Sequence, residues 1–385
     1  MTTAPDPKLF SPCTIKQVTL PNRVVIAPMC QYSAHDGLFS DWHFANYSKY
    51  ALGRPGAIIL EASAVQDIGR ITHGDLGIWS DIHADAMRGI VDFIKGQGVV
   101  PGIQIGHAGR KASVQRPWHG NGALDETDAL RGETAWPVIG PSPLPAGKGW
   151  LVPREMTRAD IAQVTADFVA AAKRANHIGM DILELHAAHG YLLQQFLSPL
   201  SNVRNDEYGG SRENRMRFLL EVTEAVRPVW PDAKPLFVRI SSVDGFEGGW
   251  SIEDSVALAK ALKAAGVDVI DCSSGGNAAA GATASTGYRG PGFQVPYADR
   301  IRRDAEIQTM AVGLILDGPQ AEDILQNGQA DLIAIAREAI NDPFWPRHQA
   351  QAMGVDLDFA HWPEQYGWWL DRRARGLHQL AKSEK

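Results

Sequence analysis

Two histidines and a tyrosine lie close together in the string HAAHGYLLQQFLSPL, as His186, His189 and Tyr191. Two imidazoles at this spacing could bind zinc, but neither an HExxH helix nor a defined third ligand accompanies them. The simplest alternative is a pair of hydrogen-bonded histidines at the end of a strand. The nearby Tyr191 and the opposing Arg239 favour a functional site over that alternative, and no metal is predicted.

Other reactive side chains follow predicted strands in the same way. In a parallel barrel the carboxyl ends of the strands meet on one face, and that face carries the active site. A thiol, an amide, a second phenol and further cationic groups are therefore expected at one rim. The relevant segments are Pro28 to Tyr32, Glu61-Ala62, Gln104, Gly106 to Lys111, His186 to Tyr191, Arg239, Gly313 and Ala336-Arg337.

Gly313 and Arg337 predict a phosphate site. Each ends one of the last two predicted strands, and loops at these places commonly bind phosphate in barrels through backbone N–H groups. Arg337 could add a bidentate charged contact. No G-x-G-x-x-G joins a strand to a helix, so a Rossmann site for a nicotinamide cofactor is not predicted.

The cysteines carry little chemistry of their own. Cys13, Cys30 and Cys272 are the three in the chain, none in CxxC spacing, which argues against a disulfide framework and an iron–sulfur cluster. Cys30 is the one candidate nucleophile, but no base is evident beside it and there is no G-x-S-x-G motif. From the residues alone it is interpreted as a buried thiol.

Eight short apolar runs alternate with helical patterns, which predicts a single (β/α)8 TIM barrel spanning residues 1–385. Their continuous hydrophobicity is typical of strands buried on both faces. Long loops follow strands 3 and 6, at residues 107–156 and 275–293, and are interpreted as walls or lids of the site. Predicted strands cover 23–29, 57–63, 99–105, 181–187, 236–241, 267–273, 308–314 and 331–337. Predicted helices begin at Asp41 and after Thr157, and cover 82–95, 213–226, 251–265, 295–303, 319–327 and 343–353.

Composition excludes several classes of partner. The 385 residues carry a formal net charge of -7 and no dense run of Lys or Arg, so neither nucleic acid nor an anionic membrane is expected. No apolar run is long enough to span a bilayer, and the first residues lack the features of a secretory signal. A cytoplasmic enzyme is expected.

Several strings resemble the Old Yellow Enzyme family, in particular its thermophilic-like or xenobiotic-reductase-like bacterial branch. The resemblance follows the chain in order and covers nearly all of it, and together the strings are highly specific. They are Ala27 to Ser33 (APMCQYS), His107 to Lys111 (HAGRK), His186 to Leu200, Asn205 to Ser211 (NDEYGGS), Ala311 to Ile315 and Ala336-Arg337.

The resemblance implies noncovalent FMN across the mouth of the barrel, reduced by NADPH or NADH that binds on the same flavin. It implies that Arg239 places positive charge beside the flavin ring and that Cys30 tunes its potential. It agrees with the independent assignment of Gly313 and Arg337 to the phosphate. The residues expected to line the ring are Ala27, Pro28, Met29, Cys30, Ala62 and Gln104.

By the same resemblance, the activity is ene-reduction of α,β-unsaturated carbonyl compounds such as enals and enones. His186 and His189 would hold the carbonyl oxygen as an oxyanion hole, Tyr32 would help to bind it, and Tyr191 would give a proton to the α-carbon.

The C-terminal segment from Trp362 to Trp369 departs from this pattern. In several relatives an arginine near the position of Trp368 reaches into the neighbouring subunit's site, and here an aromatic residue stands instead. Trp368 and Trp369 are expected to shape the substrate pocket from an interface, in a homodimer or homotetramer.

Two other functions remain as alternatives. A dienoyl-CoA-reductase-type flavin barrel would need an iron–sulfur cluster and a second nucleotide-binding domain, against which the cysteine count and chain length argue. A catalytically idle, ligand-binding barrel is disfavoured by the clustered His186, His189, Tyr191 and Arg239.

Overall fold

Eight parallel strands close into a barrel in the computed structural model, which describes residues 7–277 and 289–383. Around the barrel the strand order is β10-β11-β12-β3-β4-β5-β8-β9, and every neighbouring pair is parallel. The predicted (β/α)8 fold is confirmed. The strands are β3 (Val24–Ile26), β4 (Ala57–Ala64), β5 (Val100–Gly106), β8 (Ile182–Ala187), β9 (Leu236–Ser241), β10 (Val269–Ser273), β11 (Gln308–Ala311) and β12 (Leu332–Ile335).

Side chains alternate between the barrel interior and the layer under the helices, as the pleat of a strand requires. In β3, Val25 belongs to the interior cluster, whereas Val24 and Ile26 pack in the outer one. All three are buried, because helices cover the outside of the sheet. This double burial explains why the strands are apolar at nearly every position.

The covering helices follow the strands in turn, and several begin with a side-chain cap. Ser251 and Thr157 each accept a hydrogen bond from the third residue of their helix, in capping boxes with Asp254 and Asp160. The helices are α1 (Asp41–Leu52), α2 (Asp81–Asp85), α3 (Arg88–Gly96), α5 (Arg158–His177), α6 (Leu192–Leu197), α7 (Arg212–Val226), α8 (Ile252–Ala264), α9 (Val295–Ala305), α10 (Gly318–Gln326), α11 (Arg337–Asn341), α12 (Trp345–Ala352) and α13 (Glu364–Ser383).

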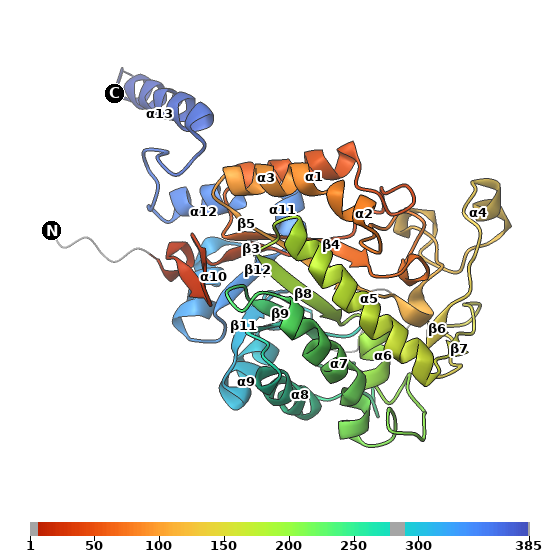
Figure 1. Cartoon of the computed structure of the whole chain (residues 1–385). Helices are drawn as coiled ribbons and strands as arrows, with labels where there is room; N and C mark the ends of the chain where they lie inside the picture. Colours follow the sequence, from red (N-terminus) through yellow and green to blue (C-terminus); the bar gives the residue numbers. More distant parts are fainter. Residues whose placement is uncertain (1–6, 278–288, 384–385) are drawn as a thin grey trace.

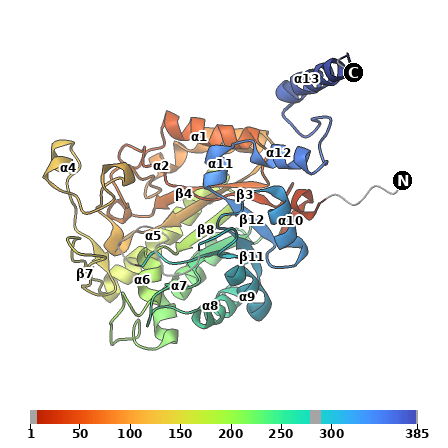
Figure 2. The same cartoon turned by 180° about the vertical axis from the view of Figure 1, so that it is seen from behind.

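The two ends of the barrel carry different additions. The antiparallel hairpin of β1 (Cys13–Ile15) and β2 (Val18–Leu20) packs Ile15 and Leu20 into the interior cluster. The long segment after β5 contains α4 (Glu126–Leu130) and the pair β6 (Ile139–Gly140) and β7 (Arg154–Glu155). Figures 1 and 2 show this segment at one end of the molecule and the hairpin (red) and α13 at the other.

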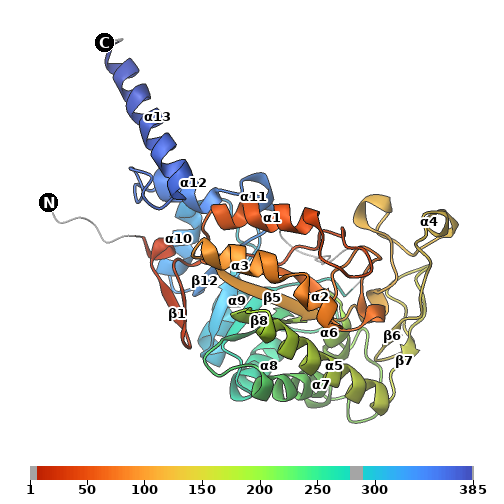
Figure 3. The ribbon, with the colours of Figure 1, turned by 45° about the horizontal axis from the view of Figure 1, so that its top comes forward.

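Several features differ from the sequence expectations. The hairpin of β1 and β2 and the short helices α4, α6 and α11 were not predicted. The single helix predicted over 82–95 is two helices, α2 and α3, because Ala86 and Met87 form a turn with Met87 fully buried. The 20-residue helix α13 was not predicted, because the charged residues between Asp371 and Arg375 interrupt its apolar positions. It projects away from the barrel (Figure 3), and Gly367 is its one buried residue.

Two further expectations concern the chain as a whole. No helix in the described part of the chain is long and apolar enough to cross a membrane. The single domain across residues 1–385 stays a prediction. The loop predicted after strand 6 falls partly on residues 278–288, outside the described residues.

Candidate active site

A sharp turn at the end of β8 places His186, His189 and Tyr191 together. His189 and Gly190 have φ values of 60° and 74°, and a Cβ on Gly190 would lie 2.2 Å from the Gly276 carbonyl oxygen. The turn therefore requires glycine there. The rings of His186 and Tyr191 meet edge to face at 4.9 Å between centroids, and those of the two histidines at 5.1 Å.

Both imidazoles are held in the neutral form. Burial lowers the pKa of His186 and of His189 well below the ordinary value, and the charges of Arg239 and Lys111 lower both further. The Nδ1 atom of His186 accepts the Ala188 N–H at 3.3 Å, so its proton is on Nε2. Nε2 of His189 lies 2.7 Å from the Ser273 hydroxyl. His186 can therefore donate a hydrogen bond without being charged.

Tyr191 is a protonated phenol at neutral pH. Burial raises its pKa well above the ordinary value, and the nearby Cys30 and Asp75 raise it further. Its side chain is 8% exposed and packs against Cys30, Tyr32 and Ala108. A neutral phenol beside two neutral imidazoles can give up a proton to a group that becomes basic during a reaction.

Lys111 braces this turn. Its ammonium group donates to the carbonyl oxygens of His189 and Gly276 at 3.0 and 2.8 Å and lies 5.4 Å from the centre of the Tyr191 ring. Burial, with the charge of Arg110, lowers the pKa of Lys111 to about 7. Its presence at the rim was predicted, but its contacts could not be, because they join three separate loops.

A cavity of about 350 Å³ opens beside His189. Three arginines contribute to it, which gives it a positive charge suited to an anion. Its lining comes from the ends of five neighbouring strands and includes Arg239, Ser273, Arg289, Phe293, Gln294, Gly313, Leu314, Ala336, Arg337 and Glu338. Gly313, Arg239 and Arg337 thus meet in one place.

Backbone donors are free at the phosphate end of this cavity. Within the described residues, the N–H groups of Gly313, Leu314 and Arg337 donate to no carbonyl or side chain. Gly313 has φ 117°, and a Cβ there would lie 2.9 Å from Gln294 and Phe293. Free N–H groups beside guanidiniums fit the phosphate of FMN.

A buried carboxylate, that of Asp271, holds the Arg239 side chain in position. The Arg239 Nε lies 3.1 Å from Asp271 on the neighbouring strand β10. Asp271 and Glu184 are fully buried in the described structure, and Glu184 accepts from the predicted flavin-lining residue Gln104 at 2.8 Å. The carboxylates of Asp271 and Glu184 therefore fix the side chains of Arg239 and Gln104 at the rim of the barrel.

The remaining predicted residues lie around this rim, apart from the two tryptophans. Ala27 directly follows β3 and belongs to the interior cluster. Ala62 lines a small cavity together with His186 and Tyr191. Pro28 and Met29 are half-buried. Trp368 and Trp369 are 53% and 67% exposed on α13, so the described chain does not bring them to its own site.

Cys30 and Tyr32 belong to the cluster around Tyr191. Burial, with the charges of Asp75 and Glu61, raises the pKa of the Cys30 thiol well above its ordinary value. A protonated thiol is a poor nucleophile. The Cys30 side chain is half-buried, whereas the residues alone predicted a buried thiol. Tyr32 has φ 50° and its ring meets Trp118 edge to face at 5.9 Å.

Three residues of the site were missed. Ser273 contacts His189 and lines the cavity, and as a polar residue at a strand end it carried a usable signal. Arg289 lines the same cavity from the Gly-rich loop. Asp75 lines a small cavity with Tyr191, and burial raises its pKa to about 7; no local sequence pattern marks it.

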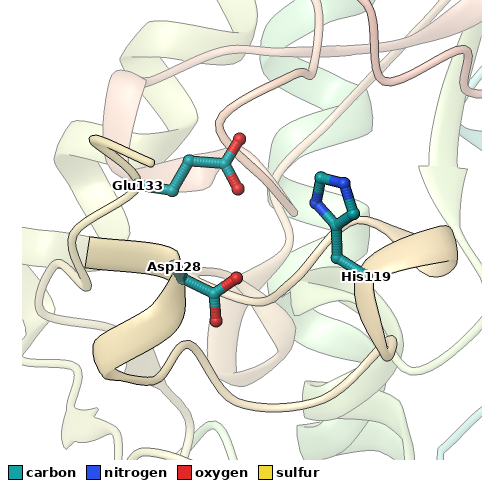
Figure 4. Close-up of side chains that lie close together, drawn as sticks. All are labelled: His119, Asp128 and Glu133. Atoms are coloured by element: carbon teal, nitrogen blue, oxygen red, sulfur yellow. The ribbon is translucent and has the colours of Figure 1, made fainter. Parts of the chain in front are cut away.

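One group of possible metal ligands lies elsewhere, in the segment after β5. His119, Asp128 and Glu133 have ligand atoms within 4.8 Å of one another (Figure 4). Arg131 already pairs with Asp128, and Arg116 pairs with Glu133. Asp128 also accepts the Asp125 N–H in the capping box of α4. The two carboxylates are thus neutralised by guanidiniums, and we assign no metal to them.

Comparison with known proteins places the chain in a family. Residues 8–354 match the profile of the NADH:flavin oxidoreductase / NADH oxidase family. An NADPH dehydrogenase of Geobacillus sp. (strain WCH70) is 47% identical over 351 residues, which cover 91% of this chain and 95% of the relative.

Solved structures agree. A morphinone reductase in complex with tetrahydroNAD has a TM-score of 0.73 at 25% identity and covers 91% of this chain and 92% of its own. A 2-naphthoyl-CoA reductase has a TM-score of 0.79 at 25% identity, and the match covers 91% of this chain but 53% of that longer one. The chain therefore belongs to the NADH:flavin oxidoreductase / NADH oxidase family, that of the Old Yellow Enzymes, and is an FMN-dependent NAD(P)H oxidoreductase.

Proposed function

We propose that the enzyme reduces the activated C=C bond of α,β-unsaturated carbonyl compounds. The observation that carries this proposal is the group of His186, His189 and Tyr191, three neutral groups packed edge to face at the end of one strand. Two are suited to hold a carbonyl oxygen and one to supply a proton. Reduction of a conjugated C=C bond needs both functions.

Three of the residues proposed to hold FMN, Arg239, Gly313 and Arg337, line the cavity of about 350 Å³. Gly313 and Arg337 take the phosphate, Arg239 lies beside the ring, and the ring is lined by Ala27, Pro28, Met29, Cys30, Ala62 and Gln104. When bound, FMN supplies the hydride that reaches the β-carbon of the substrate, after NADPH or NADH has delivered it.

The protein's own groups complete the reaction. His186 donates its Nε2–H to the carbonyl oxygen, on which negative charge grows as the β-carbon is reduced, and His189 and Tyr32 help to hold that oxygen. Tyr191 then transfers its phenolic proton to the α-carbon. Because both histidines are neutral, their role does not depend on protonation at neutral pH.

The exposed aromatic residues of α13 support an assembly. Trp368 and Trp369 meet edge to face at 4.5 Å, Arg372 lies 4.0 Å from the Trp368 ring centre, and both rings remain exposed. Exposed tryptophans are typical of interfaces. The proposed arrangement is a homodimer or homotetramer in which this segment lies near a neighbouring subunit's substrate pocket.

A direct test of the activity is anaerobic turnover of NADPH and NADH with a panel of enones, enals and maleimides. Oxidation of the nicotinamide should require the unsaturated compound and yield the saturated carbonyl in equal amount. Nicotinamide oxidation with oxygen but with no member of the panel would contradict the proposal.

Arg337→Ala should weaken FMN retention more than it disturbs the fold. The Arg337 side chain is exposed at the cavity and has no hydrogen-bonding partner within the described residues, so its loss removes a charged contact of about 1.5–3 kcal/mol with little effect on packing. The measurement is bound FMN after dialysis, with Arg303→Ala on the exposed face of α9 as control. Stoichiometric FMN in the Arg337 variant would show that the phosphate is held elsewhere.

Cys30→Ala should shift the flavin midpoint potential by roughly tens of millivolts and leave an active enzyme, because groups packed around a redox centre tune its potential. Spectroelectrochemistry measures the potential, and Cys13→Ala, in the hairpin at the other end of the barrel, is the matched control. If Cys30→Ala lost both half-reactions while FMN stayed bound, a role limited to tuning would be wrong.

A further inference from the structure

A second cavity, of about 410 Å³, lies at the end of the barrel opposite the site described above. Asn22, Arg54 and Gln97 line it, and each lies two or three residues before the start of a barrel strand, β3, β4 or β5. Its other wall comes from α12 and the segment after it, with Arg347 and His361. Figure 1 shows α12 and the N-terminal residues at this same end.

Two arginines lie side by side on the wall of this cavity. Arg347 is 6% exposed, and its Nε is buried without a hydrogen-bonding partner within the described residues. The Nε of Arg54 is likewise buried and has no hydrogen-bonding partner among the described residues. Their remaining contacts are long. Arg54 and Arg347 each donate to the His361 carbonyl, at 3.3 and 3.4 Å, and Arg347 donates to the Arg54 carbonyl at 3.4 Å.

Carbonyl oxygens alone leave these guanidiniums without a full counter-charge. A buried carboxylate, Asp356, is 1% exposed and accepts the His361 N–H at 3.1 Å. It forms no ion pair within 4 Å in the described structure. One negative and two positive charges leave this region with a net positive charge. Burial lowers the pKa of Arg347 to about 10, while Asp356 raises it and Arg54 lowers it.

The backbone at Arg54 is also unusual. Its φ is 48°, in the left-handed region that residues with a side chain seldom adopt, and Pro55 follows directly. Such conformations persist where the surroundings hold them, and they occur often at ligand sites. Here the conformation accompanies a guanidinium on the cavity wall, beside Arg347.

Part of the wall is apolar. Phe10, Pro12, Pro21, Ala350 and Val355 line it next to the arginines. A cavity that combines an apolar wall with a few convergent charged donors suits a small molecule with an apolar part and an anionic head. Guanidiniums with unused N–H groups favour carboxylate or phosphate oxygens as that head.

We propose that this cavity binds a small organic anion, with its carboxylate or phosphate between Arg54 and Arg347 and its apolar part against Phe10 and Pro12. The site is separate from the flavin and substrate sites, because parallel barrels carry their chemistry at the other end of the strands. Its ligand would therefore be an effector or a stabilising metabolite rather than a substrate.

Isothermal titration of the FMN-loaded full-length enzyme tests this in phosphate-free buffer. The probes are benzoate, phenyl phosphate and inorganic phosphate, with benzyl alcohol as the neutral analogue. Benzoate or phenyl phosphate should bind saturably with one equivalent per chain and leave the flavin absorbance unchanged, since ligands at the mouth would perturb it. Benzyl alcohol should bind on the order of tenfold more weakly or not at all. The two aromatic probes identify the head group preferred, and inorganic phosphate shows whether the apolar part is needed.

Variants locate the binding. Arg54→Gln should weaken it on the order of tenfold or more, and Arg347→Gln should do the same. Arg158→Gln, which removes a charge that is 75% exposed on α5, should not. Because Arg347 also braces the C-terminal segment, thermal unfolding without ligand identifies a variant that is merely unstable, and Arg54→Gln then decides. Each of four results would overturn the proposal. Two concern the probes: no saturable binding of either aromatic anion, or binding of benzyl alcohol as tight as theirs. The other two are unchanged binding in Arg54→Gln and a flavin spectral change that follows the titration.

Discussion

Replacing Tyr191 by phenylalanine should slow enone reduction by roughly 10²–10⁴, the range for a lost general acid. The phenol is the proposed proton donor in the group around His186, and burial keeps it protonated. Phenylalanine retains the ring that meets His186 at 4.9 Å, so binding of phenolic ligands should persist. Stopped-flow spectroscopy measures the reoxidation of the reduced flavin by the enone.

The reductive half-reaction is the internal control for this variant. Reduction of the flavin by NADPH or NADH needs no proton from Tyr191, so its rate should stay within a few-fold of the unaltered enzyme. An equal loss in both half-reactions would mean that Tyr191 maintains the shape of the site, and the proposed proton transfer would have to be abandoned.

Replacing His186 by alanine should cost on the order of 10²–10³ in the same oxidative half-reaction, the scale for removal of one oxyanion donor. The Ala188 N–H fixes the proton on Nε2, so the variant loses a donor that is already oriented. Binding of phenolate ligands, which present a similar oxygen, should weaken as well. Titration of the flavin absorbance with a phenol measures this.

His186→Asn is the matched variant, because its amide supplies an N–H donor without a titratable group. It should recover part of the phenol affinity and part of the rate. Phenol binding unchanged in His186→Ala would contradict the assignment of this residue to the carbonyl oxygen. His189→Ala should behave similarly, with the added loss of the contact to Ser273.

Much of the fold could be predicted because burial on both faces marks each strand. Val24 to Ile26 and Leu236 to Ser241 are apolar at nearly every position, and strand ends then locate the rim without knowledge of packing. The same rule brought Gly313 and Arg337 to one place before any contact was known, and the cavity contains both.

What the sequence could not predict depends on contacts between distant segments. Lys111 acts on the turn at His189 through carbonyl groups of two other loops, and carbonyl groups have no sequence signature. The Asp75 carboxylate accepts the N–H groups of Ile71 and Thr72 in a local turn. Its effect on the pKa of Tyr191, however, arises only in the folded chain. Helix α13 has almost no buried face, so the pattern used for the other helices did not apply.

The most direct test of the proposed activity is a single-turnover experiment without oxygen. The enzyme is reduced with one equivalent of NADPH and mixed with 2-cyclohexenone in a stopped-flow spectrometer. The flavin absorbance should return at a rate that saturates with enone concentration, with one equivalent of cyclohexanone formed. A flavin that stays reduced with the enone, and is reoxidised when oxygen is admitted, would contradict the proposed activity.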